Sequence, residues 1–414
     1  MKILIITSHY PPICASGHDV RCQQVAAALS ESGHRLQVLT SNYRLPAGGV
    51  PTDVGVFREL LLAADLNADE LKELSYQDVL SIDMENAGVL DYRLARFTPD
   101  LVLVWGCAQL SKSILMRLQR SGVPVAYDLH TNWLKAEVFD RDPWQWWWKC
   151  QPSFSARIRK CLMAFTGLRR RAQRKLPIYD RAELDLSMSW FASLSLREAL
   201  VGDGLKEASE VSFVYSALKP NFVEPKRQFT HNGRFMWAGR LSAGKAPGLA
   251  LDAMVQLNKA GEEVSLDIFG MGEPIQRKAM RERINAMGLG HCVEMVGIRP
   301  GEIAQHYPHY DALLVTSHCD DPFPMTPVEA MMAGLPCILS KDGGLPEIVE
   351  DGKTALLYER GSSEALVEAI KRFLSLPDAG ANLAVASRLN LQQKYSMEAY
   401  LEKLQDVVFS KIQS

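Results

Sequence analysis

The chain has 414 residues, 47% of them apolar and 23% charged, with a formal net charge of −2. At about 150 residues per domain, this length predicts two or three domains, and the near-neutral charge gives no argument for binding nucleic acid. No apolar run approaches the ~18 residues of a membrane span, and eight scattered cysteines without a CxxC pair favour reduced thiols in a cytoplasmic protein.

The first half of the chain predicts a parallel α/β domain. The apolar run KILIIT (2–7) is typical of a buried strand, and VRCQQVAAALSESG (20–33) has helical spacing that ends in a glycine at the C-cap position. HRLQVLT (34–40) then completes a βαβ unit, whose crossover is expected to be right-handed. Further strands are predicted at 99–106 and 123–130, and mainly helical structure at 44–98 and 140–180.

The second half repeats this alternation after a proline-containing linker at 214–228. Strands are predicted at 235–241, 264–270, 292–298, 311–317 and 335–340. Helices are predicted at 247–261, 273–288, 301–309 and 328–334, and a final helix at 396–412 is open to packing on either domain. The fold class is therefore α/β, with two doubly wound, Rossmann-like parallel-sheet domains, one in residues 1–218 and one in 219–395.

Residues that directly follow the predicted strands are the candidates for function, because ligands of such sheets lie beyond the carboxyl ends of the strands. The cleft between the two domains is the expected site. Gly17 lies in a loop before a helix, where free N–H groups favour an anion, although Pro-Pro and Gly are also ordinary turn residues. Arg240 and Lys245 suit a pyrophosphate, or they are a pair of solvated loop charges. His130 ends a strand and is either a catalytic group or a structural histidine.

The stretch DDPFPMTPVEAMMAGLP (320–336) contains three carboxylates, of which Asp321 and Glu329 are the candidates for function. One interpretation is purely structural. Thr326 at the N-cap, a proline at the first helical position and Glu329 at the third would form a capping box. The other interpretation is that the same helix start faces the cleft and Glu329 binds a hydroxyl-rich or anionic ligand. Spacing alone leaves both open.

The segment 144–175 combines four tryptophans with many basic residues and has no acid between Lys149 and Lys175. Tryptophan at headgroup depth and cations on anionic lipid would give peripheral contact with the inner membrane surface. The alternative is a solvated basic face, with the tryptophans packed in the core or lining an acceptor pocket.

Taken in order, these motifs resemble the retaining glycosyltransferases of family 4, which have the two-domain GT-B architecture. The resemblance rests on PPxxxSG in the first loop, His130, GRLxxxK at 239–245, GMGE at 270–273, an acid-x7-acid motif before AMMAGLP, and GGLPEIVEDGKTALLY at 343–358. It spans nearly the whole chain and is strongest from 232 to 358.

The resemblance implies that a sugar moves from a nucleotide-diphosphate donor, with UDP favoured, to an acceptor hydroxyl, with retention at the anomeric carbon. It implies no metal and no other cofactor, and it leaves the acceptor unassigned. The catalytic residues that it implies are His130, Arg240, Lys245 and Asp321. The donor-binding residues that it implies are Gly17, Arg240, Lys245, Gly270, Gly272, Arg299, Asp321, Met325, Thr326 and Glu329.

The sequence departs from the family pattern near the donor sugar. Asp321 stands where the family usually has Glu, and Pro324, which has no N–H to offer a ligand, stands where Gly is common. Ser16 replaces a usual glycine, and Ala246-Pro247 replaces the glycine after the lysine. The identity of the sugar is therefore open. Alternatives on the same fold are a nucleotide-sugar epimerase or phosphorylase and a non-catalytic nucleotide-sugar-binding protein.

Overall fold

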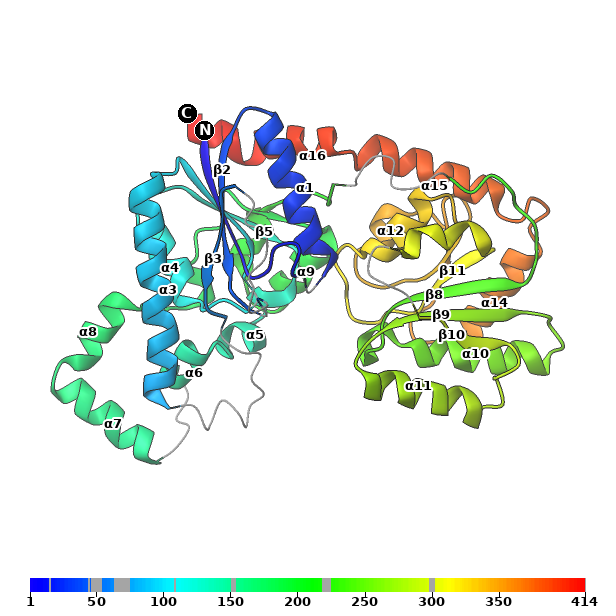
Figure 1. Ribbon diagram of the computed structural model, residues 1–414, viewed down its shortest axis with the longest axis horizontal. Coiled ribbons are helices and arrows are strands. Elements are labelled where there is room, and N and C mark those ends of the chain that lie inside the picture. The colour runs from blue at the N-terminus through cyan, green and yellow to red at the C-terminus, as the bar shows by residue number, and fades with distance from the viewer. Residues whose placement is uncertain are drawn as a thin grey trace. The chain divides into compact units, whose positions relative to one another are not determined.

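The structure of the protein is a computed structural model (Figure 1). It describes residues 1–14, 16–43, 45, 54–62, 75–107, 109–149, 154–217, 225–297 and 302–413. The chain forms two compact units. Unit 1 comprises Met1–Ala192, Leu196–Val214 and Leu401–Ser414, and unit 2 comprises Ser193–Ser195 and Tyr215–Tyr400.

Unit 1 is built on a seven-stranded sheet in the order β3-β2-β1-β4-β5-β6-β7, and every neighbouring pair is parallel. The strands are β1 Lys2–Thr7, β2 Arg35–Ser41, β3 Val56–Leu60, β4 Leu101–Gly106, β5 Val125–Leu129, β6 Trp190–Phe191 and β7 Ser212–Phe213. Ile3 of β1 pairs with Leu36 on one side and with Leu101 on the other. The first predicted strand is therefore confirmed, and it lies inside the sheet.

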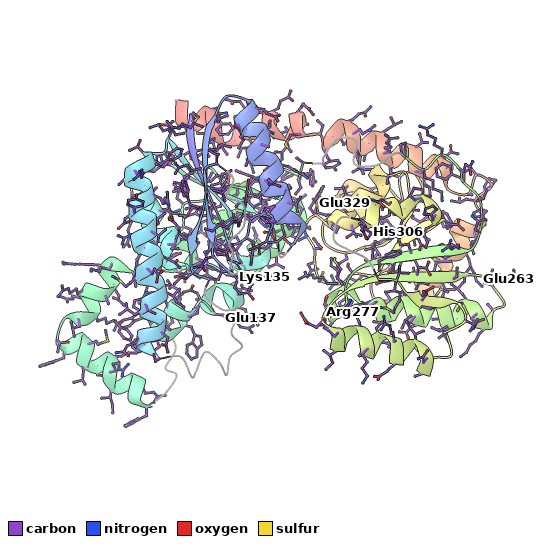
Figure 2. The ribbon with its side chains drawn as sticks, viewed as in Figure 1. Lys135, Glu137, Glu263, Arg277, His306 and Glu329 are labelled. Atoms are coloured by element: carbon purple, nitrogen blue, oxygen red, sulfur yellow. The ribbon has the colours of Figure 1, made fainter. Side chains whose placement is uncertain are left out.

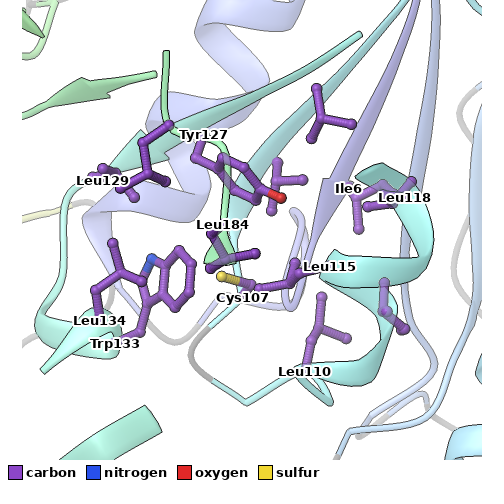
Figure 3. Close-up of a cluster of buried hydrophobic side chains, with 14 of the residues drawn as sticks. Ile6, Cys107, Leu110, Leu115, Leu118, Tyr127, Leu129, Trp133, Leu134 and Leu184 are labelled. Carbon is purple, nitrogen blue, oxygen red and sulfur yellow. The ribbon is translucent and has the colours of Figure 1, made fainter. Parts of the chain in front are cut away.

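The helices of this part of the chain connect the strands and cover the sheet. They are α1 Gly17–Glu31, α3 Tyr76–Phe97, α4 Ser113–Gln119, α5 Ala136–Asp140, α6 Pro143–Lys149, α7 Phe154–Phe165, α8 Leu168–Lys175 and α9 Leu194–Gly202. Short 3-10 turns occur at Asn132–Leu134, Arg181–Glu183 and Lys206–Glu210. The main core lies between the sheet and this layer, where Ile6 and Tyr127 pack with Leu115 and Leu118 of α4 (Figure 3).

Three of the four tryptophans of the basic segment belong to a second, smaller core, while Trp146 is partly exposed. Trp144, Trp147 and Trp148 are at most 7% exposed and cluster with Val79 of α3 and Met163 of α7. Their spacing puts them on one face of α6, so a single helix buries all of them. The expectation that these tryptophans reach lipid headgroups is therefore wrong, and the alternative of core packing is correct.

Unit 2 is built on a six-stranded parallel sheet in the order β10-β9-β8-β11-β12-β13. The strands are β8 Arg234–Arg240, β9 Ser265–Met271, β10 Val293–Met295, β11 Ala312–Val315, β12 Cys337–Ser340 and β13 Leu356–Tyr358. Side chains of β8 alternate between two cores. Phe235 and Trp237 point into one, and Met236 points into the other, as expected for a strand buried on both faces.

The helices of unit 2 supply the outer layers of these two cores. They are α10 Pro247–Lys259, α11 Pro274–Ala286, α12 Met325–Met332, α13 Leu345–Ile348, α14 Ser363–Leu374 and α15 Ala381–Lys394. Helix α16, Met397–Leu404, begins in unit 2 and ends in unit 1. Short 3-10 turns occur at Ala243–Lys245, Ile303–Gln305 and Tyr307–His309. The two units thus have the doubly wound parallel architecture that the sequence predicts.

Several elements differ from the prediction. The helix predicted at 301–309 is two 3-10 turns in its described part, because Pro308 has no N–H to continue a helical ladder. β3 lies in a segment predicted to be mainly helical, while β6, β7 and β13 have only two or three residues each and carry no periodic signal. The cysteines in the described part of the chain are free thiols.

The last residues of the chain return to unit 1. After α16 the helix continues as a π-helical turn at Gln405–Phe409 and as α17 Ser410–Gln413. Phe409 stacks on His34 with ring centroids 5.1 Å apart, and the Lys411 ammonium donates to the Ser187 carbonyl at 2.6 Å. The predicted final helix, which was open to packing on either domain, therefore ends on unit 1.

Candidate functional site

The strand order of unit 2 reverses between β8 and β11. From β8 the chain adds β9 and β10 on one side of the sheet, and it then returns to add β11, β12 and β13 on the other side. Connections that leave two adjacent parallel strands in opposite directions open a crevice at the carboxyl ends of those strands. The loops after β8 and β11 are therefore the structural candidates for a ligand site in this unit.

The loop after β8 carries the two predicted cations. Arg240 is the last residue of β8 and is exposed, and its guanidinium has no hydrogen bond or ion pair within the described residues. Lys245 ends a 3-10 turn, after which Ala246 takes a left-handed conformation (φ 44°) and Pro247 begins α10. The Thr316 hydroxyl lies 2.9 Å from the carbonyl oxygens of Lys245 and Ala246, so the end of β11 anchors this turn.

The loops after β8 and β11 touch through a glycine. The His318 N–H donates to the Gly244 carbonyl at 2.9 Å. A Cβ atom at position 244 would lie 2.7 Å from the Cβ atom of Cys319, closer than side-chain carbons approach each other. Glycine is therefore required here because two backbones come together, and the close approach brings Lys245 next to the acidic stretch.

Lys245 and Asp321 form an ion pair across these two loops. The Lys245 ammonium lies 2.6 Å from Asp321 Oδ2, with the side chains 19% and 23% exposed. The two residues are 76 positions apart in the sequence, so spacing could not reveal the pair. A charged, partly buried lysine at a switch point is available to an anionic ligand that competes with Asp321.

The loop that carries Asp321 is held in place by residues that sequence analysis did not assign to the site. The buried Asp342 carboxylate accepts from the backbone N–H of Cys319 (3.1 Å) and Asp320 (3.4 Å). Arg360 bridges Asp320 and Asp342 at 2.7 and 2.8 Å. Gly343 and Gly344 follow, and a Cβ atom on either would overlap the backbone of 321–322. The only sequence signal for this support was the GG pair in 343–358.

Glu329 is the most perturbed acid of this region. It lies on α12 (Figure 2), and its partly buried side chain has no hydrogen bond within the described residues. Burial raises its pKa from the ordinary 4.5 to about 7. Loss of hydration makes the ionised form of this unpaired carboxylate costly, and hydroxyl donors from a ligand would stabilise it. Carboxylates with a strongly raised pKa cluster at functional sites.

The capping box predicted for Glu329 is wrong. The N-cap is Pro324 in extended geometry (φ −71°, ψ 114°), so α12 begins at Met325 and Thr326 is already its second residue. Pro327 is tolerated because the N–H groups of a first helical turn have no intrahelical partner. Glu329 therefore lies more than one turn inside the helix and does not cap it. Met325 and Thr326 form the first turn and are partly exposed.

The GMGE turn adjoins the β8 loop. The Leu241 N–H donates to the Met271 carbonyl at 2.8 Å, and a Cβ atom at Gly270 would lie 2.6 Å from Leu241 Cδ2. Gly272 is exposed and precedes Glu273, the N-cap of α11. The predicted residues Gly270 and Gly272 thus lie beside the loop of Arg240, whereas Arg299 lies outside the described residues.

Unit 1 has a switch point of its own, between β1 and β4. The Ser8 N–H donates to the Gly106 carbonyl at 2.7 Å, which ties the two loops together. Helix α1 begins at Gly17, three residues before its predicted start, because Ser16 serves as N-cap and its N–H donates to the Asp19 carboxylate at 2.8 Å. Gly17 is exposed at the first helical position, the end of a helix whose dipole favours an anion.

His130 belongs to a buried polar cluster of unit 1. Its ring lies against the ring of His18, with centroids 4.2 Å apart and the planes tilted by 33°, and its Nδ1 lies 3.4 Å from Asp128 Oδ1. The other Asp128 oxygen accepts from Arg21 at 2.7 Å, and both of these side chains are fully buried. His130 Nδ1 and Asp128 Oδ1 have no hydrogen-bond partner among the described residues, so this contact is a close approach and not a hydrogen bond. Sequence analysis missed His18 and Arg21, whose three-residue spacing on α1 was the available signal.

Neither a metal cage nor a membrane crossing is found in the described ranges. No group of three or more His, Cys, Asp or Glu side chains there is arranged to hold a metal ion. None of the described helices combines the length and the hydropathy that a bilayer crossing requires.

Comparison with known proteins gives a family match within unit 2. Residues 222–390 match the family model "Glycosyl transferases group 1". Spore coat protein SA of Bacillus subtilis is 26% identical over 42% of this chain and 47% of its own length. That match therefore spans about half of each protein. An uncharacterized glycosyltransferase of Methanocaldococcus jannaschii, MJ1607, is 22% identical over 96% of this chain and 95% of its own length.

Solved structures extend the likeness to the whole chain. A sucrose-phosphate synthase from Thermosynechococcus elongatus superposes with a TM-score of 0.71, at 18% identity, over 99% of this chain and 98% of its own. Anabaena HepE in complex with UDP-glucose superposes with a TM-score of 0.65, at 19% identity, over 99% and 100% of the two chains. The chain therefore has the two-domain GT-B fold, and its residues 222–390 match the model of the glycosyl transferases group 1 family.

Proposed function

We propose that the protein is a retaining hexosyltransferase that moves a sugar from a nucleotide-diphosphate donor to an acceptor hydroxyl. The observation that carries the proposal is the ion pair of Lys245 and Asp321 at the switch point of unit 2, in loops that follow β8 and β11, with Arg240 at the end of β8. Cations at that position suit a diphosphate, and carboxylates suit hydroxyl groups. This combination matches the donor-binding roles that the family resemblance implies.

The chemical demand on the protein is to stabilise the departing diphosphate. Arg240 offers a planar fork of donors and Lys245 offers a compact point charge. The backbone N–H groups that begin α12 add partial positive charge where negative charge develops. In this proposal the leaving phosphate itself takes the acceptor proton, so no dedicated protein base is required and the reaction proceeds without a metal ion.

UDP is the nucleotide that we propose for the donor. Its support is the likeness in fold to HepE, whose crystal structure contains UDP-glucose. In this assignment Glu329 accepts the ribose hydroxyls, and Asp321 contacts hydroxyls of the sugar. A carboxylate whose pKa burial has raised to about 7 gains most from two hydroxyl donors, because they replace the water that it has lost.

His130 is proposed to act near the reacting centre. Its imidazole is buried and lies 3.4 Å from the Asp128 carboxylate, which Arg21 holds, so its surroundings differ from those of a solvated surface histidine. His130→Ala is therefore expected to lower turnover while the melting temperature stays near that of the wild type.

The test is a thermal-shift panel of UDP-, GDP-, ADP- and dTDP-sugars, followed by transfer assays on a broad set of acceptors. A ligand that binds only the folded state raises its melting temperature. UDP-sugars are expected to give the largest shift, and Arg240→Ala and Lys245→Ala are each expected to reduce that shift and to lower turnover by orders of magnitude.

The same panel separates the alternatives. No shift with any nucleotide sugar, or unchanged turnover in both variants, would overturn the proposed site. Donor binding without transfer to any acceptor would favour a nucleotide-sugar-binding protein, and conversion of the donor in the absence of an acceptor would favour an epimerase or a phosphorylase.

A further inference from the structure

Helix α7 exposes an apolar stripe. Phe154, Ile158, Leu162 and Phe165 are 78%, 48%, 60% and 93% exposed, and these residues constitute the α7 stripe. Their spacing of four, four and three residues places them within one arc of the helix. Isolated exposed apolar side chains are ordinary, but a contiguous row of four marks an interaction surface.

The opposite face of α7 fastens this helix to unit 1. Met163 is buried with the tryptophans of α6, and the Lys160 ammonium lies 5.0 Å from the centre of the Trp147 ring. From α8, Arg169 lies 5.6 Å from the centre of the Trp148 ring. The α7 stripe could therefore be buried against unit 1 only if α7 rotated and these contacts were broken. Figure 1 shows α7 and α8 as a helical pair at the rim of this unit, beyond α6.

The charge on α7 and α8 has one sign. Residues 154–175 contain no Asp or Glu. Their cations are Arg157, Arg159, Lys160, Arg169, Arg170, Arg171, Arg174 and Lys175. All of these except Lys160 are exposed. An apolar row bordered by cations and free of acids complements a surface that is apolar inside and anionic outside.

We propose that α7 and α8 dock unit 1 on an anionic lipid bilayer, with the α7 stripe inserted at the boundary between headgroups and acyl chains. Amphipathic helices with bulky apolar residues on one face and Arg or Lys beside it bind bilayers in this orientation. The cations then meet lipid phosphates, which attract basic residues near the surface. The buried tryptophans of α6 hold the docking element and do not enter the lipid. This inference does not depend on the proposed transferase activity.

Vesicle flotation of the full chain tests the stripe. The wild type is expected to float with vesicles of phosphatidylglycerol and phosphatidylcholine and to stay in the dense fraction with phosphatidylcholine alone. The double variant Ile158→Asp/Leu162→Asp is expected to reduce the floating fraction at least ~10-fold, because two carboxylates would enter the boundary region. The control is Val385→Asp/Leu389→Asp, which alters two exposed apolar residues with the same spacing on α15 and is expected to float like the wild type.

A second pair of variants tests the charge. Arg170→Glu/Arg171→Glu on α8 is expected to lose most of the binding at low salt, while Lys278→Glu/Arg281→Glu, with the same change of net charge on exposed α11, is expected to keep it. Wild-type binding is expected to weaken as salt rises.

Three results would overturn the proposal. The first is a wild type that does not float with anionic vesicles. The second is equal flotation of the α7 and α15 variants. The third is a concentration-dependent dimer in sedimentation that the α7 variant abolishes, since the stripe would then be covered by a second copy of the chain.

Discussion

Lys245 has a counter-charge before any donor arrives. Asp321 holds the Lys245 ammonium at 2.6 Å, and both side chains are about one-fifth exposed. A diphosphate that binds Lys245 must displace this carboxylate or accept it as a neighbour of like charge. Either effect weakens the binding of a free nucleoside diphosphate. Contacts between Asp321 and the sugar would restore binding free energy when the whole donor is bound.

Asp321→Asn is therefore expected to separate binding from turnover. The Kd for UDP should fall ~3- to 5-fold, equivalent to about 1 kcal/mol. The reason is that Lys245 no longer has to break its ion pair with residue 321 in order to bind the diphosphate. Turnover of the UDP-sugar should fall. Calorimetric titration with UDP and a transfer assay measure the two effects. Asp252→Asn, which alters a surface pair with Arg283, is the control and should change neither. Weaker UDP binding by Asp321→Asn would mean that Asp321 positions Lys245 for the phosphates.

Glu329 makes folding stability depend on pH. Its folded-state pKa of about 7 lies above the ordinary 4.5, so the folded protein holds this proton more tightly than the unfolded chain. The stability that results is complete below pH 4.5 and is lost as pH rises through 7. At 1.36 kcal/mol per pKa unit, the loss is about 3 kcal/mol.

Glu329→Gln removes this dependence. Urea unfolding is expected to give similar free energies of unfolding for wild type and variant at pH 4.5, and a variant more stable by up to about 3 kcal/mol at pH 8. The variant should also bind UDP more weakly at pH 8, because the amide is a poorer acceptor than a carboxylate. A stability difference that is the same at both pH values would contradict the raised pKa.

For single residues, sequence analysis locates a site residue within its own element but cannot locate its partner when the two lie far apart along the chain. The positions of Arg240, Lys245 and His130 at strand ends could be predicted, because apolar runs locate strands and the residues after them. The pairing of Lys245 with Asp321 and the support of Asp128 by Arg21 could not, since each pair joins residues 76 or 107 positions apart. Which of two carboxylates is desolvated likewise depends on packing that no motif encodes.

Elements meet in unit 2 through backbones as well as side chains. The turn after β8 and the loop after β11 come together at Gly244 and Cys319, and Gly343 and Gly344 bring the loop after β12 against the same acidic stretch. The capping box in this stretch was mispredicted because the helix begins two residues earlier, at Met325 after an extended Pro324 that offers no side-chain cap. Local propensity could not choose between two starts one or two residues apart.

Gly244→Ala should therefore disturb the site without unfolding the unit. The added Cβ atom, 2.7 Å from Cys319 Cβ, must push the two loops apart and move Lys245 away from its place beside the acidic stretch. The KM for the donor is expected to rise ~10-fold or more, because a shift of about 1 Å in a binding group has effects of that size. Gly290→Ala, where the nearest atom lies at an ordinary 3.5 Å, is the control. Unchanged donor kinetics in Gly244→Ala would show that the loops move independently.

At the scale of the whole molecule, the chain does not finish one unit before it builds the other. It passes from unit 1 to unit 2 at Tyr215 and returns at Leu401. The doubly wound class of both units could be predicted, because alternating strands and helices admit few parallel topologies. The unit on which the last helix packs could not be predicted, since its apolar face suits any complementary groove. In the structure, Leu404, Val408 and Phe409 are buried after the chain has returned to unit 1.

Phe409→Ala is expected to destabilise unit 1 selectively. The Phe409 ring is 4% exposed and stacks on His34, so its removal leaves a cavity that costs about 3 kcal/mol. Native-state hydrogen exchange should speed up in β1 and β2 of unit 1, while β8 and β9 of unit 2 keep the rates of the wild type, because each unit has its own core. Phe213→Ala, which removes a ring that is 40% exposed in the same unit, is the control and should change exchange little. Equal acceleration in both units would mean that they unfold as one cooperative body, and the C-terminal return would then stabilise the entire chain.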